Sequence, residues 1–164
     1  MNSRDKIVTL DVLCAMLQAA RAQHRSIVLA NGIFDLLHVG HVRYLEAAKR
    51  EGHLLVVAIN SDSSARQLKG PGRPVLDERA RAELVAALQA VDRVVVFNTL
   101  NVEPLLEAIR PDVHAKGTDY TPDSVPERQT AARLGIRVAI VGDPKQHSTS
   151  DLFSRIRASA GSRQ

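Results

Sequence analysis

Residues 26–52 read SIVLANGIFDLLHVGHVRYLEAAKREG, and this stretch decides the fold. Its opening segment, SIVLA, is short, apolar and β-branched, which predicts a buried strand. The segment after the second histidine places Val42, Leu45 and Ala48 on one helical face and stops at Gly52, which predicts a helix. A strand followed directly by a helix is the first unit of an α/β fold.

Two histidines, His38 and His41, fall at the junction of this strand and helix. His38 is expected in the turn and His41 in the first helical turn, where unpaired backbone N–H groups and a partial positive charge suit an anion. Gly40 lets the helix start approach a ligand closely. Three roles are open for the pair: metal ligation, a structural role in the turn, and stabilisation of phosphate. The pair lacks the i, i+4 spacing with an intervening glutamate that is typical of catalytic zinc sites, so phosphate chemistry is favoured.

The same alternation of apolar strands and amphipathic helices continues along the chain. Asp77 is a plausible N-cap for a helix whose Leu84, Val85 and Leu88 face inward, and Gly135 is expected to end a later helix. The pattern predicts an α/β fold with a doubly wound, five-stranded parallel sheet that is Rossmann-like. A ligand should then bind beyond the carboxyl ends of the strands, near a switch point in strand order. Further strands are predicted at 54–59, 93–97, 112–116 and 136–142, and further helices at 77–91, 102–109, 126–135 and 151–159.

Length and composition predict one domain with a real core, because the chain has 164 residues and is 45% hydrophobic. We expect an N-terminal helical extension at 1–25, the main domain at 26–157 and a frayed tail at 158–164. Polar residues such as Asp11 interrupt the N-terminal segment, which argues against a secretory signal, and there is no stretch of 18 apolar residues. A cytoplasmic protein without a membrane span is expected.

Charge and composition narrow the class of ligand. The formal net charge is +4, but aromatic residues make up only 3% of the chain, and no block of five or six like charges occurs. Few side chains are therefore available to stack on nucleic-acid bases, so nucleic acid is disfavoured and a small phosphorylated substrate explains the charge. The single cysteine excludes an internal disulfide.

A basic segment follows the second predicted strand. It contains Arg66, Lys69 and Arg73, and Arg79 comes shortly after it. These residues could be an ordinary solvated surface, or a mobile flap that supplies counter-charges. The glycines and prolines of KGPGRP at 69–74 are compatible with the flap.

Two more groups of polar residues are expected at the carboxyl edge of the sheet. Ser148, Thr149 and Ser150 begin the last predicted helix, where hydroxyl groups either cap the helix or form a second anion seat. Asp35 and Asp119 are the carboxylates closest to this edge. They either contact a nucleotide or its Mg²⁺, or cap turns.

Three motifs of other nucleotide-binding and hydrolytic enzymes are absent from the sequence. There is no G-x-G-x-x-G after the first strand, which disfavours a nicotinamide or flavin dehydrogenase. There is no G-x-x-x-x-G-K-[ST] of P-loop proteins and no G-x-S-x-G nucleophile elbow. A nucleotide-binding sensor without turnover would keep such a fold, but it could lose either histidine, and both are present.

The segment GIFDLLHVGH at 32–41 resembles the H-x-G-H signature of the nucleotidyltransferase superfamily, and HSTSDLFSRI at 147–156 resembles its second motif. NSDSSARQLKGPGRPV, ERARAELVAALQAVDRVVVF and RPDVHAKGTDY are similar to one branch in particular. That branch is the adenylyltransferase module of bifunctional heptose-phosphate kinase/adenylyltransferases, which act in lipopolysaccharide precursor synthesis. The similarity runs from about residue 26 to residue 157.

The resemblance implies an enzyme that transfers AMP from Mg²⁺-bound ATP to a sugar 1-phosphate, such as a heptose 1-phosphate, and releases pyrophosphate. A cytidylyltransferase that acts on glycerol 3-phosphate or another polyol phosphate is the alternative. Relatives are commonly dimers, which leaves a homodimer open. The implied catalytic residues are His38, His41 and Lys69, and Arg66 and Arg73 would bind substrate. The implied nucleotide-binding residues are Asn31, Gly32, Phe34, Asp35, Gly40, Arg79, Lys116, Gly117, Asp119, Ser148 and Thr149.

Overall fold

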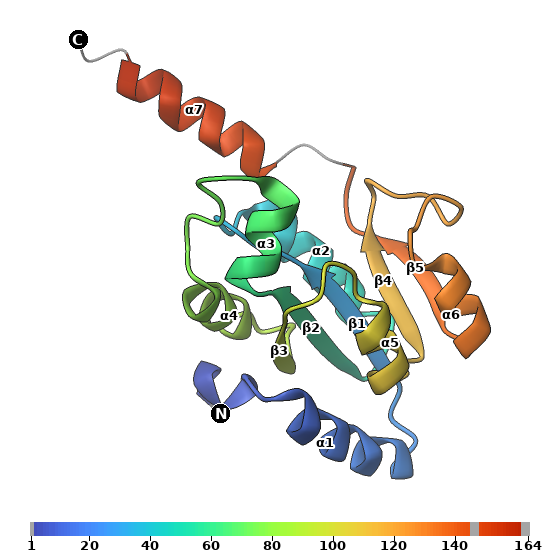
Figure 1. The fold of residues 1–164 in the computed structure, drawn as a ribbon. Coiled ribbons are helices and arrows are strands. Elements are labelled where there is room, and N and C mark those ends of the chain that lie inside the picture. The colour runs from blue at the N-terminus through green and yellow to red at the C-terminus, as the bar shows by residue number, and fades with distance from the viewer. Residues whose placement is uncertain (1, 145–147, 162–164) are drawn as a thin grey trace.

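The computed structural model describes residues 2–144 and 148–161, which form an α/β fold around one sheet (Figure 1). His147, the first residue of the second motif, lies outside the described residues. The strands are β1 (Ile27–Gly32), β2 (Leu54–Asn60), β3 (Arg93–Phe97), β4 (Val113–Gly117) and β5 (Arg137–Val141). The helices are η1 (Ser3–Lys6, a 3-10 helix), α1 (Leu10–Ala22), α2 (Val39–Lys49), α3 (Asp62–Lys69), α4 (Glu78–Ala86), α5 (Glu103–Ile109), α6 (Arg128–Leu134) and α7 (Thr149–Gly161).

The sheet confirms the predicted fold class. Its five strands are all parallel, in the order β3-β2-β1-β4-β5. From β1 the chain adds β2 and then β3 on one side of the sheet. It then returns to add β4 and β5 on the other side of β1, so the switch point lies between β1 and β4. Ligands in such sheets bind at the carboxyl ends of the strands beside the switch point.

Helices cover both faces of the sheet, and each face has its own apolar core (Figure 1). On one face, Leu45 of α2 and Val85 of α4 pack against alternate strand residues such as Val57. On the other face, Leu13 of α1 and Leu106 of α5 pack against the intervening strand residues. This division follows from the two-residue period of a strand, which sends successive side chains to opposite faces.

One segment predicted as a loop is helical. The expectation that Arg66 and Lys69 lie in a loop is wrong, because α3 spans Asp62–Lys69. The Ser61 hydroxyl caps the helix by accepting a hydrogen bond from the Ser64 backbone N–H at 3.2 Å. The helix ends at Gly70, whose φ of 89° is readily adopted only by glycine. Its few apolar residues produce no recognisable helical period, which is why the sequence pattern missed it.

The structure also bears on three smaller expectations. Leu84 was expected to face inward, but it is an exposed residue of α4, because the helix turns Val85 and Ala86 toward the sheet. The tail expected from residue 158 is helical as far as Gly161, within α7. The residues expected to form an N-terminal extension include α1, whose Leu13 is fully buried against the sheet.

Candidate active site

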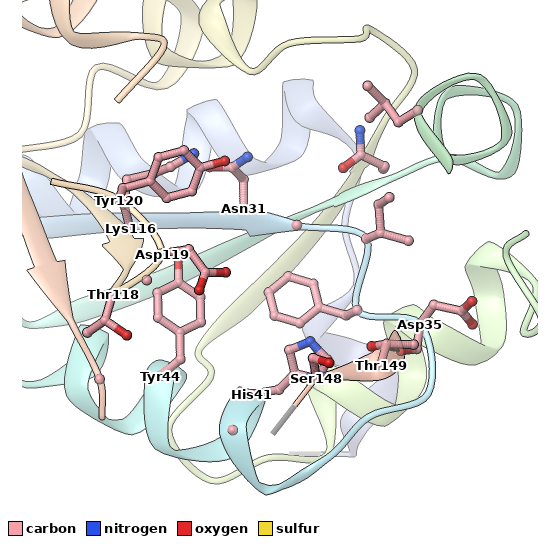
Figure 2. A pocket seen from close by; sticks show the side chains of 18 of the residues that line it. Asn31, Asp35, His41, Tyr44, Lys116, Thr118, Asp119, Tyr120, Ser148 and Thr149 are labelled. Atoms are coloured by element: carbon pink, nitrogen blue, oxygen red, sulfur yellow. Dashed lines mark hydrogen bonds between the residues drawn. The ribbon is translucent and has the colours of Figure 1, made fainter. Parts of the chain in front are cut away.

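A cavity of about 620 Å³ opens at the carboxyl edge of the sheet, where all the predicted site residues except Arg66 and Arg79 come together. Segments that are far apart in the sequence line it: the loop after β1, the end of α3, the loop after β4 and the start of α7. In Figure 2, Asn31, Lys116 and Tyr120 lie on one side of the cavity, and His41, Ser148 and Thr149 on the other. The predicted residues that line it are Asn31, Gly32, Phe34, Asp35, His38, Gly40, His41, Lys69, Arg73, Lys116, Gly117, Asp119, Ser148 and Thr149.

His38 and His41 are held at the start of α2 by a reciprocal cap. His38 is the N-cap, and its Nδ1 accepts a hydrogen bond from the Gly40 backbone N–H at 3.1 Å. The Nδ1 of His41 accepts one from the His38 backbone N–H at 3.3 Å. The two rings stack with centroids 3.9 Å apart. Because Nδ1 of each neutral ring is an acceptor, its proton resides on Nε2, so each ring presents an Nε2–H donor.

His41 is neutral at physiological pH. Burial, and secondarily the neighbouring His38, lowers the pKa of His41 to about 4. A neutral imidazole at this position is a hydrogen-bond donor through Nε2 and not a proton reservoir. The helix N-terminus adds a partial positive charge, so the position favours an anionic ligand.

The loop after β1 contains two residues in unusual backbone conformations. Phe34 and Leu36 have φ values of 53° and 49°, a region that non-glycine residues seldom adopt. The buried Phe34 ring packs at 5.3 Å from the His41 ring, measured between centroids. Such conformations persist where surrounding contacts enforce them, and they cluster at functional sites.

Asp35 is the anchor that enforces this loop conformation. Its carboxylate forms an ion pair with Arg73 at 2.9 Å and accepts hydrogen bonds from the Val75 and Leu76 backbone N–H groups at 2.9 and 3.2 Å. Burial by itself raises the pKa of Asp35, but these hydrogen bonds and the Arg73 guanidinium outweigh it and lower the pKa below its usual value. These contacts show Asp35 holding the turn, and its predicted contact with a nucleotide stays a prediction.

Arg73 and Thr149 connect this anchor to the last helix. The Arg73 guanidinium lies 4.5 Å from the centroid of the Phe153 ring of α7. The Thr149 hydroxyl donates a hydrogen bond to the Asp35 carbonyl at 2.9 Å, and the Ser148 hydroxyl accepts one from the Asp151 backbone N–H at 3.1 Å. The start of α7 therefore lies at the same edge of the sheet as the start of α2, and both bring hydroxyl or imidazole groups to the cavity.

A buried ion pair lies at the end of β4. Lys116 and Glu127 are joined by an ion pair of 3.5 Å, and each side chain is 7% exposed. Burial lowers the pKa of Lys116, and the Glu127 carboxylate opposes this shift. The Lys116 ammonium also lies 4.5 Å from the centroid of the Tyr120 ring. Both charged side chains line the cavity, so a bound ligand can contact either the ammonium or the carboxylate.

Sequence reasoning missed several residues of the cavity, among them Tyr44, Gly142 and Glu127. Tyr44 lines it and donates a hydrogen bond from its hydroxyl to the Ala115 carbonyl at 2.8 Å. The sequence did carry this signal, because Tyr44 follows His41 by three residues and so shares its helical face. Gly142 has a φ of 97°, and a Cβ there would lie 3.3 Å from the Tyr44 Cα. Glu127 had no local signal, since it reaches the cavity only through the packing of the loop before α6.

Arg66 and Arg79 do not line the cavity, and both are exposed. The buried arginine of this region is Arg81, which is fully buried. It donates hydrogen bonds to the Ile33 carbonyl at 2.6 Å and the Asn60 carbonyl at 2.8 Å. Arg81 thus ties the ends of β1 and β2 together. The binding roles predicted for Arg66 and Arg79 stay predictions.

Residues 2–144 and 148–161 contain neither a metal-binding cluster nor a membrane-spanning helix. No group of three or more histidine, cysteine, aspartate or glutamate side chains is arranged there to hold a metal ion. No helix in the same ranges is long and apolar enough to cross a membrane.

Comparison with known proteins agrees with this geometry. The chain is 43% identical over 155 residues to a bifunctional protein HldE of Pelobacter propionicus, and 46% identical over 152 residues to one of Methylobacillus flagellatus. These matches cover 94% and 93% of this chain but only 32% and 31% of the relatives, so the chain spans about a third of their length.

A solved structure is similar as well. The crystal structure of the lipopolysaccharide core biosynthesis protein from Thermoplasma volcanium matches with a TM-score of 0.64 and 27% identity, over 74% of this chain and 99% of that one. The cytidylyltransferase-like family model matches residues 29–154, which run from β1 into α7 and include both histidines. The chain therefore belongs to the cytidylyltransferase-like family.

Proposed function

We propose that this protein is an adenylyltransferase that transfers AMP from Mg²⁺-bound ATP to a sugar 1-phosphate, with heptose 1-phosphate as the expected acceptor. The observation that carries the proposal is the pair of stacked imidazoles at the start of α2, which face a cavity that the start of α7 also lines. Two helix starts at one edge of a sheet are suited to a chain of phosphates.

The proposed reaction is a direct displacement. A phosphate oxygen of the sugar 1-phosphate attacks the α-phosphorus of ATP, the bond from that phosphorus to the bridging oxygen breaks, and pyrophosphate leaves with the electron pair. The Nε2–H groups of His38 and His41 would donate to the α-phosphate as its negative charge shifts during the reaction. Because His41 has a pKa of about 4, it acts as a neutral donor. Orientation and charge stabilisation would then account for catalysis without a general base.

Other residues of the cavity would hold the rest of the substrates. Ser148 and Thr149, at the start of α7, would bind the β- and γ-phosphates. Lys69, at the end of α3, would supply a positive charge to the phosphates. The Nε–H of Arg73 donates to Asp35 at 2.9 Å, so Arg73 would hold the loop and bind substrate through its two terminal NH₂ groups.

The residues present fit a metal that arrives on the nucleotide. The two carboxylate oxygens of Asp35 already accept hydrogen bonds from Arg73, Val75 and Leu76, so Asp35 has little capacity left for a cation. Asp119 lines the cavity and is the carboxylate that would approach Mg²⁺ or the nucleotide. Mg²⁺ would neutralise charge on the triphosphate.

The acceptor is proposed from the resemblance of KGPGRP and KGTDY to the heptose-phosphate branch and from the similarity to HldE proteins. The product would be an ADP-heptose, a precursor of lipopolysaccharide. Because the chain spans about a third of those relatives, the acceptor must be tested on this chain itself. The homodimer, the cytoplasmic location and the absence of a nucleic-acid partner also stay proposals.

A panel of substrates tests the proposal directly. The purified chain is incubated with ATP, CTP, GTP or UTP, each combined with a heptose 1-phosphate, a hexose 1-phosphate or glycerol 3-phosphate, and pyrophosphate release is measured. We expect the fastest turnover with ATP and the heptose 1-phosphate. Fastest turnover with CTP and glycerol 3-phosphate would replace the adenylyltransferase by a cytidylyltransferase.

A further inference from the structure

A buried histidine outside the predicted site contacts a residue that lines the cavity. His114 lies in the middle of β4 and is fully buried. Its Nε2 is 2.9 Å from the side-chain oxygen of Asn31, at the end of β1. Its Nδ1 is buried and has no hydrogen-bond partner among the described residues. Burial, with a smaller effect of Lys116, lowers the pKa of His114 to about 3, so the ring is neutral.

The hydrogen bond sets the proton position on His114. The Asn31 side-chain oxygen can only accept, so Nε2 of His114 must carry the proton and Nδ1 the lone pair. The reverse arrangement would leave a buried N–H at Nδ1 with no acceptor, and buried unpaired donors are rarer and costlier than buried unpaired acceptors. The neutral Nε2–H form is therefore the stable one.

The orientation of the Asn31 amide follows from this proton position. With its oxygen bound to His114, the NH₂ group of Asn31 is left for the cavity, which Asn31 lines. The Lys116 ammonium, the Glu127 carboxylate and the Tyr120 ring line the same cavity and contact one another. Figure 2 places Asn31 near Lys116 and Tyr120, away from His41 and Ser148.

This combination of groups suits one kind of ligand. An amide donor, an ammonium donor, a carboxylate acceptor and an aromatic ring together match a ring that bears hydroxyl groups. The ring would lie apart from the reacting phosphates at the starts of α2 and α7. Both the ribose of a nucleotide and the ring of a sugar phosphate have this chemistry.

A purely structural role explains His114 poorly. An apolar residue of similar volume at this position would fill the same space without burying an unpartnered nitrogen, which costs free energy. Leu29, the register partner of His114 in β1, is an apolar residue of the core on this face. The imidazole of His114 supplies an N–H donor to the Asn31 side chain within this core.

We propose that His114 is a positioning residue, which holds the Asn31 amide with its NH₂ group facing the cavity so that it donates to a hydroxyl-bearing ring of a substrate. This inference rests on the same cavity as the proposed function and deepens it. It does not require that AMP be the group transferred, because it concerns the binding of a ligand before any reaction.

Equilibrium binding of single ligands tests the inference without turnover. The dissociation constants of an ATP analogue with a methylene bridge between the α- and β-phosphates, and of a sugar 1-phosphate, are measured by calorimetry. The variants are His114→Leu, His114→Gln, Asn31→Ala and the double variant. His114→Leu should weaken one of the two ligands about fivefold to tenfold, the effect of one lost hydrogen bond. The ligand that is weakened identifies the ring.

The double variant and the glutamine variant separate positioning from packing. If His114 acts through Asn31, His114→Leu adds nothing to the loss caused by Asn31→Ala. Glutamine places an amide N–H close to the position of Nε2, so His114→Gln should restore binding to within about twofold of the parent, as expected for a retained donor. Equal losses in both backgrounds, or no loss for either ligand, would overturn the inference.

Two further measurements keep the test independent of folding and of the reaction. Thr130→Val is the matched control, because it removes another buried hydrogen bond beside this face, from Thr130 to Glu103 at 2.8 Å, outside the cavity. It should lower the melting temperature and leave both dissociation constants unchanged. Nitrogen-15 NMR of the unchanged protein reports the His114 proton directly, and a proton on Nδ1 would contradict the inference. A chain that binds normally but fails the substrate panel would reject the proposed function alone.

Discussion

His38 and His41 stack with ring centroids 3.9 Å apart, and the backbone N–H of His38 donates to Nδ1 of His41 at 3.3 Å. His38, the first residue of the H-x-G-H motif, thus has two roles. Its side chain lines the cavity, and its backbone N–H holds the ring of His41 in place. The arrangement turns both Nε2–H groups into donors with a fixed proton position. It explains why these residue types stand three apart: one caps the helix and the other reaches back from its first turn.

The first prediction concerns removal of one donor. His41→Ala should lower kcat by about 10²- to 10³-fold, roughly 3 to 4 kcal/mol, as expected for the loss of a donor to a transition-state charge. Folding and the dissociation constant of ATP should change much less. Steady-state kinetics and calorimetry measure the two effects. A variant that folds normally and keeps near-normal kcat would remove His41 from the mechanism.

The second prediction concerns stability at acidic pH. Burial lowers the pKa of His41 to about 4 and that of His114 to about 3, from 6.5 in the unfolded chain. Between these values the unfolded chain binds protons that the folded chain does not, so the free energy of unfolding should fall as pH is lowered from 7 to 5. Each histidine contributes up to about 1.4 kcal/mol per pH unit in this window.

Urea unfolding at pH 7, 6 and 5 measures this dependence. His114→Gln removes one of the two groups, so its stability should change less with pH than that of the parent protein. A parent stability that is flat from pH 7 to pH 5 would show that these rings are not buried in their neutral form.

The third prediction concerns the loop anchor. Asp35→Asn removes the charge that pairs with Arg73 and weakens the acceptor for the Val75 and Leu76 amides. We expect a loss of about 1 to 3 kcal/mol in stability, as for a buried charged hydrogen bond. In the parent protein without ligand, hydrogen exchange at the Val75 and Leu76 amides should already be slow. Fast exchange at both amides that becomes slow only when ATP is added would show instead that this segment is a mobile flap.

The fourth prediction compares two cations of one helix. Lys69 lines the cavity, whereas Arg66, one helical turn earlier, does not. Lys69→Ala should lower kcat/KM by at least about tenfold, because it removes a charge that faces the phosphates. Arg66→Ala tests the substrate-binding role predicted for that residue: because Arg66 is exposed and outside the cavity, we expect a change in kcat/KM of less than about twofold, which would reject that role. Equal losses for the two variants would mean that substrate reaches beyond the cavity.

The fifth prediction concerns the base. ATP should be preferred over CTP by at least about tenfold in kcat/KM, or about 1.4 kcal/mol, when the heptose 1-phosphate is the acceptor. Buried polar groups of the cavity would be left unpaired by the wrong base, which is the strongest source of such discrimination. Competition between ATP and CTP at equal concentration measures the ratio. Equal rates would show that the cavity does not read the base.

The sequence by itself determined the succession of the strands and of most helices along the chain, and the position of the helix start that carries His38 and His41. The apolar runs, the Asp77 cap and the Gly135 stop are local signals, and each acts within a few residues of its own position. The H-x-G-H segment likewise sets its own cap, since His38 and His41 contact each other within one helical turn. Periodicity and capping depend on neighbours in the chain, so they can be read without the fold.

Only the tertiary structure decided which distant residues meet. Asn31 and His114 are 83 positions apart, and they touch because the chain crosses over and places β4 beside β1. The pairing of Lys116 with Glu127 depends on the packing of the loop before α6 against the end of β4. Local propensity does not encode the order of the strands within the sheet, because that order depends on which helices cover which face of the whole sheet. The polar groups on this side of the cavity therefore come together only when the sheet is complete.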